Sequence, residues 1–185
     1  NGTEPCMAYV KDAYQAVLYR ERLYVFTDNN VGLGIYVSDA DGANRRLLTE
    51  IKNVRWIGGF STEFYKDRLV IVGNRSERLE GEDGEMTVEN YTGIYSIDCT
   101  TGQTTVCEKE WNDRVTIRSI DDTSVYVYYN YIDEAIYETY TAEELNNNVS
   151  LYADYQTVEL WQCNLENGSA TELYAGDFGS NCYPI

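Results

Sequence analysis

Gly93-Ile94-Tyr95-Ser96-Ile97-Asp98 has the residues of a strand, and it is followed by the turn Thr101-Gly102 and by Thr104-Thr105-Val106-Cys107. Isoleucine, valine, threonine and tyrosine favour the pleated, half-buried surface of a strand. A glycine adopts the positive φ of a tight hairpin turn without a Cβ clash. The stretch therefore predicts two antiparallel strands joined by a short turn.

The same order of strand, glycine turn and strand occurs twice more in the chain. Before it stands Gly34-Ile35-Tyr36-Val37-Ser38-Asp39 with the turn Asp41-Gly42. After it stands Glu159-Leu160-Trp161-Gln162-Cys163-Asn164 with the turn Asn167-Gly168. The three turn glycines are 60 and 66 residues apart, so the chain is an internal repeat rather than one irregular domain.

Each repeat carries two further strand patterns. One precedes this hairpin, at 22–27, 68–72 and 124–128. The other lies between units, at 16–19, 54–57 and 115–117. Four strands per unit are typical of a β-propeller blade. We therefore predict an all-β, β-propeller-like segment over 1–185, with about three four-stranded antiparallel blades at 14–49, 54–110 and 114–175.

At these strands and turns the chain resembles the TolB-like propeller repeats, whose blades have a strand of the form Ile-Tyr-x-x-Asp, a glycine turn and a short last strand. The Ser-Pro-Asp-Gly signature of typical members is missing, and Tyr65-Lys66-Asp67-Arg68 stands nearest to it. Related repeats occur in uncharacterised extracellular and lipoprotein-type proteins of Gram-positive gut bacteria. The resemblance implies a bacterial, secreted or cell-surface protein, and says nothing of a particular partner.

A closed propeller needs at least four blades, so three units leave the ring open. Two outcomes follow. The chain is a fragment of a longer protein, as its start at Asn1 without an initiator methionine suggests, or two copies associate into a six-bladed ring.

The charge of the chain bears on its partners. The formal net charge is −17, and no lysine or arginine follows Arg118. Such a field repels the phosphates of nucleic acids and anionic membrane surfaces, and attracts cations or basic partners. No apolar run is long enough to span a bilayer. We therefore expect no nucleic-acid binding and no membrane insertion.

Histidine is absent from the sequence, which removes the commonest general base and the usual zinc ligand. Catalysis by a pair of carboxylates stays formally open. Asp39-Ala40-Asp41-Gly42-Ala43-Asn44 has oxygen ligands at alternating positions, as calcium requires, although a plain hairpin turn is the preferred interpretation. We expect no enzyme activity, no metal site and no cofactor.

Five cysteines form no Cys-x-x-Cys motif, so neither a zinc nor a redox motif is present. Cys107 and Cys163 fall within strand patterns and are expected to be buried small hydrophobic residues. Cys6 and Cys182, near the two chain ends, could form a disulfide.

The connections between the second and third strands of the units differ most in length: 28–33, about 73–92 and about 130–158. Insertions on a repeat scaffold tend to gather on one face, often the binding face. The third connection combines aromatic rings with carboxylates, a combination that suits sugar rings or cationic side chains. The candidate ligand-binding residues are Tyr129, Tyr131, Asp133, Glu134, Tyr137 and Tyr140. The alternative is that these tyrosines only pad an extra hairpin. Thr141-Ala142-Glu143-Glu144 has the spacing of a helix capping box.

The sequence is compatible with three functions. The first is a non-catalytic extracellular module that recognises a protein, peptide or glycan through its long loops. The second is a structural, self-assembling surface protein. The third is the accessory propeller of a hydrolase whose catalytic domain lies outside this chain.

Overall fold

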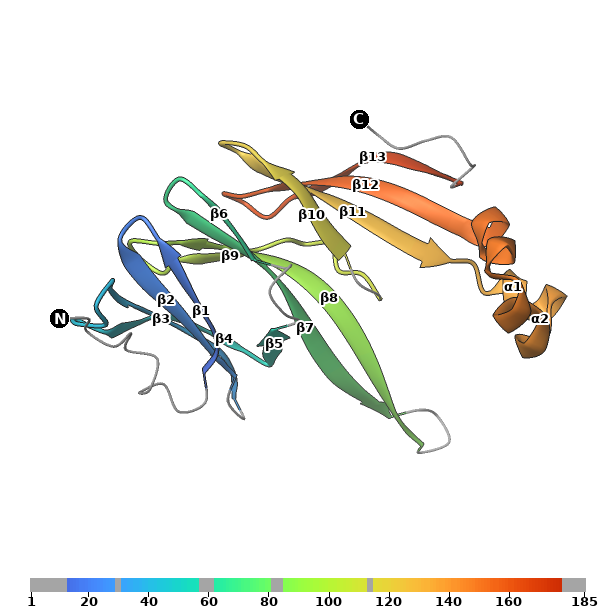
Figure 1. Cartoon of the computed structure of the whole chain (residues 1–185), viewed down its shortest axis with the longest axis horizontal. Coiled ribbons are helices and arrows are strands. Elements are labelled where there is room, and N and C mark those ends of the chain that lie inside the picture. The colour runs from blue at the N-terminus through green and yellow to red at the C-terminus, as the bar shows by residue number, and fades with distance from the viewer. Residues whose placement is uncertain (1–12, 29–30, 57–61, 81–84, 113–114, 178–185) are drawn as a thin grey trace.

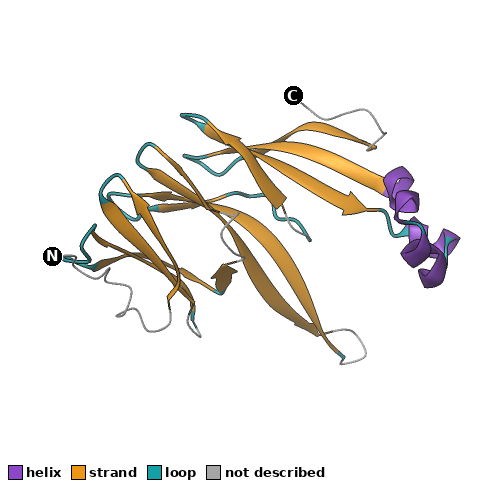
Figure 2. Cartoon of the chain, viewed as in Figure 1, coloured by secondary structure: helices purple, strands orange, loops and turns teal. Residues whose placement is uncertain are grey.

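The computed structural model describes residues 13–28, 31–56, 62–80, 85–112 and 115–177. Cys6 and Cys182 lie outside these residues. Strands dominate, and three antiparallel sheets follow one another along the chain (Figures 1 and 2). The predicted all-β fold with three four-stranded, blade-like sheets is confirmed.

The first sheet has the order β1-β2-β3-β4, and its strands are Ala13–Tyr19, Arg22–Asp28, Gly32–Asp39 and Arg46–Lys52. The third sheet has the order β10-β11-β12-β13, and its strands are Val115–Ile120, Ser124–Ile132, Gln156–Asn164 and Ala170–Asp177. In both sheets sequence neighbours pair as neighbours, in the meander of a propeller blade.

The second sheet has the order β5-β7-β8-β9, with the additional strand β6 pairing β7. Its strands are Val54–Trp56, Thr62–Tyr65, Arg68–Glu80, Met86–Asp98 and Thr104–Val106 for β5 to β9. Both β5 and β6 pair with the edge of β7 that β8 leaves open. The first strand of this sheet is therefore two short pieces instead of the single strand predicted at 54–57.

The interpretation of 73–92 as a loop is wrong. β7 and β8 pair without interruption from Arg68↔Asp98 to Glu80↔Met86, so most of this connection is a long hairpin that projects beyond its own sheet (Figure 1). Its polar residues hid the strand pattern, because no neighbouring sheet requires one apolar face along the projecting part.

The interpretation of 130–158 as an extra hairpin is also wrong. β11 continues to Ile132, and two short helices and a 3₁₀ helix lead back to β12. They are α1 (Ala135–Thr139), α2 (Ala142–Asn147) and η3 (Val149–Tyr155). The predicted capping box is confirmed, since the Thr141 side chain accepts from the Glu144 N–H and the Glu144 carboxylate accepts from the Thr141 N–H.

Two hydrophobic cores lie between the sheets. The core between the first and second sheets includes Phe26, Ile35, Ile71 and Tyr95. The core between the second and third sheets includes Val72, Ile94 and Val127, among others. Both faces of the second sheet are buried, which explains the unbroken apolar run 69–72, whereas the first and third sheets each contribute one face to these two cores.

Corresponding positions of the repeat face corresponding neighbours. Ile35 packs toward the second sheet and Ile94 toward the third, so this position faces the following sheet. The next residue, Tyr95, packs toward the first sheet, and Trp161 packs toward the second. Since side chains alternate along a strand, Leu160 of the third sheet faces away from the second sheet. Leu160 is only half-buried, whereas Ile35 and Ile94 are fully buried.

The turn glycines place each sheet against the one before it. Gly102 has φ +77°, and a Cβ there would come within 2.0 Å of the Leu48 carbonyl oxygen. Gly168 also has φ +77°, and its Cβ would lie 2.1 Å from the Val106 carbonyl oxygen. A side chain is excluded by both backbone conformation and space. The repeated glycine therefore marks close contact between sheets as well as a turn.

In the second and third units, a polar residue at the end of the strand before the glycine turn accepts hydrogen bonds from the turn. The Asp98 carboxylate accepts hydrogen bonds from the N–H groups of Thr100 and Thr101, and the Asn164 amide oxygen accepts from Glu166 and Asn167. In the first unit Asn44 donates to Asp39 and the Ala43 N–H donates to Asp41, within the expected hairpin turn.

Asp98→Asn should reduce the acid sensitivity of the protein. The N–H and hydroxyl donors of Thr101 and its neighbours lower the pKa of Asp98. A lowered carboxyl pKa gives stability that is present above the ordinary value of about 4 and is lost as the pH falls through the lowered value. Asparagine can hold the turn, as Asn164 does, without this titration. The urea midpoint of the variant should therefore fall less than that of the wild type between pH 6 and pH 2.

The control is Asp98→Ala, which should lose about 1 kcal/mol of stability at pH 6, because the turn donors lose their acceptor. If the difference in stability between the wild type and Asp98→Asn stays the same at every pH, the role given to the Asp98 carboxylate is contradicted.

Candidate recognition site

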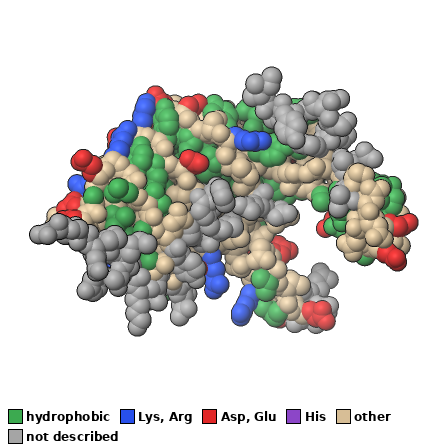
Figure 3. All heavy atoms as spheres, in the orientation of Figure 1, with side chains coloured by type: hydrophobic (Ala, Val, Ile, Leu, Met, Phe, Trp, Pro, Cys, Tyr) green, Lys and Arg blue, Asp and Glu red, His purple; other side chains and the backbone are tan. Residues whose placement is uncertain are grey.

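The two long connections leave the same rim of the sheet stack. The short β1–β2, β6–β7 and β10–β11 turns lie along one rim, while the β7–β8 hairpin and the helical insertion project at the other (Figure 1). In space-filling view an open notch separates the hairpin from the insertion (Figure 3). The prediction that insertions gather on one face agrees with this arrangement.

Four aromatic side chains form a row on the side of the third sheet that faces the second. We call Trp161, Trp111, Tyr129 and Tyr131 the aromatic row. The ring centroids of Trp111 and Trp161 are 6.2 Å apart at 80°, and those of Trp111 and Tyr129 are 6.4 Å apart. Tyr129 and Tyr131 stack at 5.2 Å with planes 27° apart. The row runs from the core between the sheets toward the helical insertion.

Charged groups flank the buried end of the row. The Lys109 ammonium lies 4.9 Å from the ring centroid of Trp161, and Trp161 Nε1 donates to Glu159 Oε2 at 2.6 Å. These contacts fix the Trp161 ring by a cation–π interaction and a charge-assisted hydrogen bond. Trp111 is 1% exposed. Lys109 and Glu159 therefore hold the buried end in place, and the half-exposed Tyr131 is the end available to a ligand.

The other predicted site residues belong to the insertion. Tyr140 meets Tyr155 edge to face at 6.1 Å, and Ile136 of α1 and Leu145 of α2 are buried. Asp133 Oδ1 accepts from the Ala135 N–H at 2.9 Å, so this carboxylate starts α1. Glu134 is exposed beside it, and Tyr137 is 60% exposed on α1.

The ring contacts therefore sort the predicted residues into two groups. Tyr129 and Tyr131 belong to the aromatic row. Tyr140 contacts Tyr155 within the insertion, and Tyr137 of α1 is exposed to solvent. Sequence reasoning missed Trp111 and Lys109. Trp111 pairs with Thr92 as an isolated bridge after the last strand of the second sheet, where no alternating pattern marks it. The sequence did offer one signal: Val127, Tyr129 and Tyr131 alternate along one strand, so their side chains lie on the same face of the sheet.

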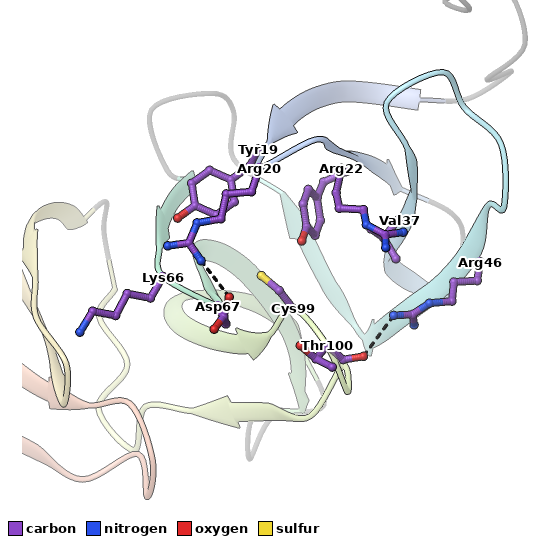
Figure 4. Close-up of a pocket in the computed structure, with 10 residues that line it drawn as sticks. Tyr19, Arg20, Arg22, Val37, Arg46, Lys66, Asp67, Cys99 and Thr100 are labelled. Atoms are coloured by element: carbon purple, nitrogen blue, oxygen red, sulfur yellow. Dashed lines mark hydrogen bonds and ion pairs between the residues drawn. The ribbon is translucent and has the colours of Figure 1, made fainter.

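A second feature lies on the opposite rim, between the first and second sheets. It is a cavity of about 300 Å³ whose lining includes Tyr24, Cys99 and four cationic side chains (Figure 4). The cations are Arg20, Arg22, Arg46 and Lys66. They come from short turns and strand ends separated in sequence, so the acidic composition of the whole chain concealed their clustering.

The cations of this cavity are engaged with the protein itself. Arg20 pairs with Asp67 at 2.9 Å, and Arg46 Nη2 donates to the Thr100 carbonyl at 3.1 Å (Figure 4). Lys66 pairs with Asp122 of the third sheet. Burial raises the pKa of Tyr24 and of the Cys99 thiol, and so keeps both neutral. These contacts join neighbouring sheets, so the residues that line the cavity stabilise the packing of the sheets.

Comparisons with known proteins support the fold. No protein-family model matches the sequence, and no curated protein matches it either. A solved structure, Pyrococcus horikoshii acylaminoacyl peptidase in an orthorhombic crystal form, is similar with a TM-score of 0.53 and 21% identity. The match covers 89% of this chain and 25% of the peptidase chain. At this identity the likeness shows the fold alone.

Among the residues that the structure describes, no helix is long and apolar enough to cross a membrane.

Proposed function

We propose that this chain is a non-catalytic recognition segment of a β-propeller, and that it binds a protein or peptide, or a glycan, at the rim from which the hairpin and the helical insertion project. The observation that carries the proposal is the common rim of the two insertions, together with the stacked Tyr131 at the end of β11, where the strand leads into the helical insertion. A repeat scaffold that carries its insertions on one rim presents them together to one ligand.

The chemistry of the rim suits a ligand with apolar and cationic groups. The hairpin exposes Leu79, Met86 and Val88, and α1 exposes Tyr137. Carboxylates surround these groups, and the exposed ones on the two projections include Glu80, Glu85, Glu89, Asp133, Glu134, Glu138, Glu143 and Glu144. Aromatic faces beside carboxylates bind cationic side chains and sugar rings. The negative field favours a basic peptide or protein, or a neutral glycan, over an acidic one.

A non-catalytic role fits the residues available. A chain without histidine has no Ser-His or Cys-His pair. At the proposed rim, the Asp133 carboxylate is engaged in starting α1. We place the protein outside the cell, in the class of bacterial TolB-like repeat proteins, on the strength of its blade motifs. A secreted fraction that lacks the protein, in the organism that makes it, would overturn this placement.

Alanine replacement of the exposed aromatic groups tests the binding rim. Tyr131→Ala and Tyr137→Ala should each weaken the signals of bound peptides or neutral glycans on an array about fivefold or more, because exposed tyrosines supply contact area at low entropic cost. The measurement is a titration of the labelled chain on the array, followed by a dissociation constant for the strongest hit.

Tyr174→Ala is the matched control, since Tyr174 is also half exposed but lies on β13 away from the aromatic row. It should leave the array signals unchanged. If Tyr131→Ala and Tyr137→Ala bind the array as strongly as Tyr174→Ala, this rim is not the binding site.

An accessory role in a hydrolase is the second candidate function. The likeness to one quarter of a peptidase chain favours it. The full coding sequence decides: a hydrolase domain beside these sheets supports the accessory role, and further repeats alone support a recognition or self-assembling protein.

A further inference from the structure

Two buried cysteines from neighbouring sheets meet in the core between the second and third sheets. Cys107 follows β9 of the second sheet, and Cys163 lies on β12 of the third. Their sulfur atoms are 2.7 Å apart, and the two residues are 56 positions apart in sequence. The two cysteines are unlinked in this structure, and the separation lies between the length of a disulfide bond, about 2.05 Å, and a van der Waals contact of two sulfur atoms. The sequence prediction that both are buried is confirmed, at 5% and 1% exposure.

The backbone around the two cysteines is held in place across the sheet boundary. The Glu108 N–H donates to the Gly168 carbonyl at 2.8 Å, and the Ala170 N–H donates to Glu108 Oε1 at 2.8 Å. The Cys107 N–H donates to the Ile94 carbonyl, and Cys163 is in register with Ala170. A disulfide forms only where the two backbones hold the cysteines at a suitable separation, and these hydrogen bonds fix the two segments that carry them.

We propose that Cys107 and Cys163 form a disulfide bond that joins the second and third sheets. The bond forms between the two Sγ atoms, and the two thiols lose two protons and two electrons. A small-molecule disulfide such as oxidised glutathione accepts them and is cleaved to two thiols. The thiolate of one cysteine attacks one glutathione sulfur and releases one glutathione; the thiolate of the other then attacks the first cysteine's sulfur in this mixed disulfide and releases the second glutathione.

Thiol–disulfide exchange requires that the small-molecule disulfide reaches one of the two sulfur atoms. Both sulfurs are buried in the folded chain, so the exchange takes place before the two sheets close. The remaining described cysteine, Cys99, contacts Tyr24 in the other inter-sheet region and is not a competitor. The bond requires an oxidising compartment, and it does not depend on what the rim binds.

Peptide mapping of the wild-type chain tests the proposal directly. The chain is unfolded with reductant, refolded in a mixture of reduced and oxidised glutathione, alkylated and cleaved after glutamate. Peptide 160–166 contains Cys163, and peptide 90–108 contains Cys99 and Cys107. We expect these peptides to be linked, lighter than their sum by two hydrogen atoms, with fragment ions that place the bond on Cys107.

A folded protein in which Cys107 and Cys163 are both alkylated, or carry only glutathione, would overturn the proposal. A bond from Cys163 to any other cysteine would overturn it equally.

Thermal unfolding gives an independent readout. The oxidised wild type should melt about 10 °C above the reduced form, because the bond removes loop entropy from the unfolded chain. The difference should vanish in Cys107→Ala and Cys163→Ala and persist in Cys99→Ala. A difference that persists in Cys107→Ala would assign the effect to another pair. If an alanine variant does not fold, the peptide map of the wild type still decides.

Discussion

Trp111→Ala is expected to lower the free energy of unfolding by about 3–5 kcal/mol, a large fraction of the stability of a domain of this size. Trp111 is 1% exposed and fills the core between the second and third sheets. Its ring contacts Trp161 and Tyr129, and its backbone forms both hydrogen bonds of a bridge to Thr92. Alanine keeps the bridge and leaves a cavity the size of an indole ring. Urea unfolding followed by circular dichroism measures the loss.

Trp111→Phe is the matched control. Within the described residues, Trp111 Nε1 has no hydrogen-bond partner, so phenylalanine removes a costly buried donor while keeping most of the ring. We expect the phenylalanine variant to lose much less stability than the alanine variant. A loss below about 1 kcal/mol for Trp111→Ala would contradict the central place of this ring in the core.

Trp111 also shows where sequence reasoning stops. The three hairpins were predictable, because Ile94-Tyr95 and its equivalents stand in strands of β-branched and aromatic residues and each is followed by a glycine turn. Trp111 follows the last strand of its unit and contacts the sheet through a single bridge. A single residue cannot show a hydrophobic periodicity, so the burial of Trp111 follows only from the packing of the second and third sheets.

The long hairpin was hidden for a related reason. Between Arg75 and Asn90 polar residues stand on both faces, because no sheet covers this part of β7 and β8 among the described residues. Only backbone hydrogen bonds continue the strands there. Such pairing does not require alternating apolar residues, so the sequence shows no strand pattern. The capping box at Thr141 was predictable because it is local. Helix α1 was not, since it buries only Ile136.

The candidate site was half predictable. The composition of the insertion indicated tyrosines and carboxylates, and the structure places two of the tyrosines, Tyr129 and Tyr131, in one stacked pair. It assigns Asp133 to starting a helix, which no spacing in the sequence distinguishes from a ligand-binding role. Trp111, which contacts Tyr129, and Trp161, which contacts Trp111, come from two different sheets. Their meeting depends on how sheets stack, which strand patterns do not specify.

The second large effect is expected from a pair of equivalent substitutions, Ile94→Ala and Leu160→Ala. Both residues occupy the repeat position that faces the following sheet. Ile94 is 2% exposed against the third sheet, and its removal should cost about 2–5 kcal/mol of unfolding free energy. Leu160 is half-buried on the outer face of the third sheet, so alanine there should cost less than about 1.5 kcal/mol in this chain alone.

The comparison measures whether the sheet stack is continued by another blade. In a longer chain with a fourth blade, or in a six-bladed ring of two copies, Leu160 would be covered as Ile94 is, and Leu160→Ala should then cost nearly as much as Ile94→Ala. The two cases separate by concentration: a ring of two copies melts at a higher temperature as the chain is concentrated, and a covalent fourth blade does not show this dependence. Light scattering gives the mass at each concentration. If Leu160→Ala costs as much as Ile94→Ala in a strict monomer of this chain, the chain itself already covers the outer face of the third sheet. Neither a fourth blade nor a second copy is then needed to explain the apolar residue at this repeat position.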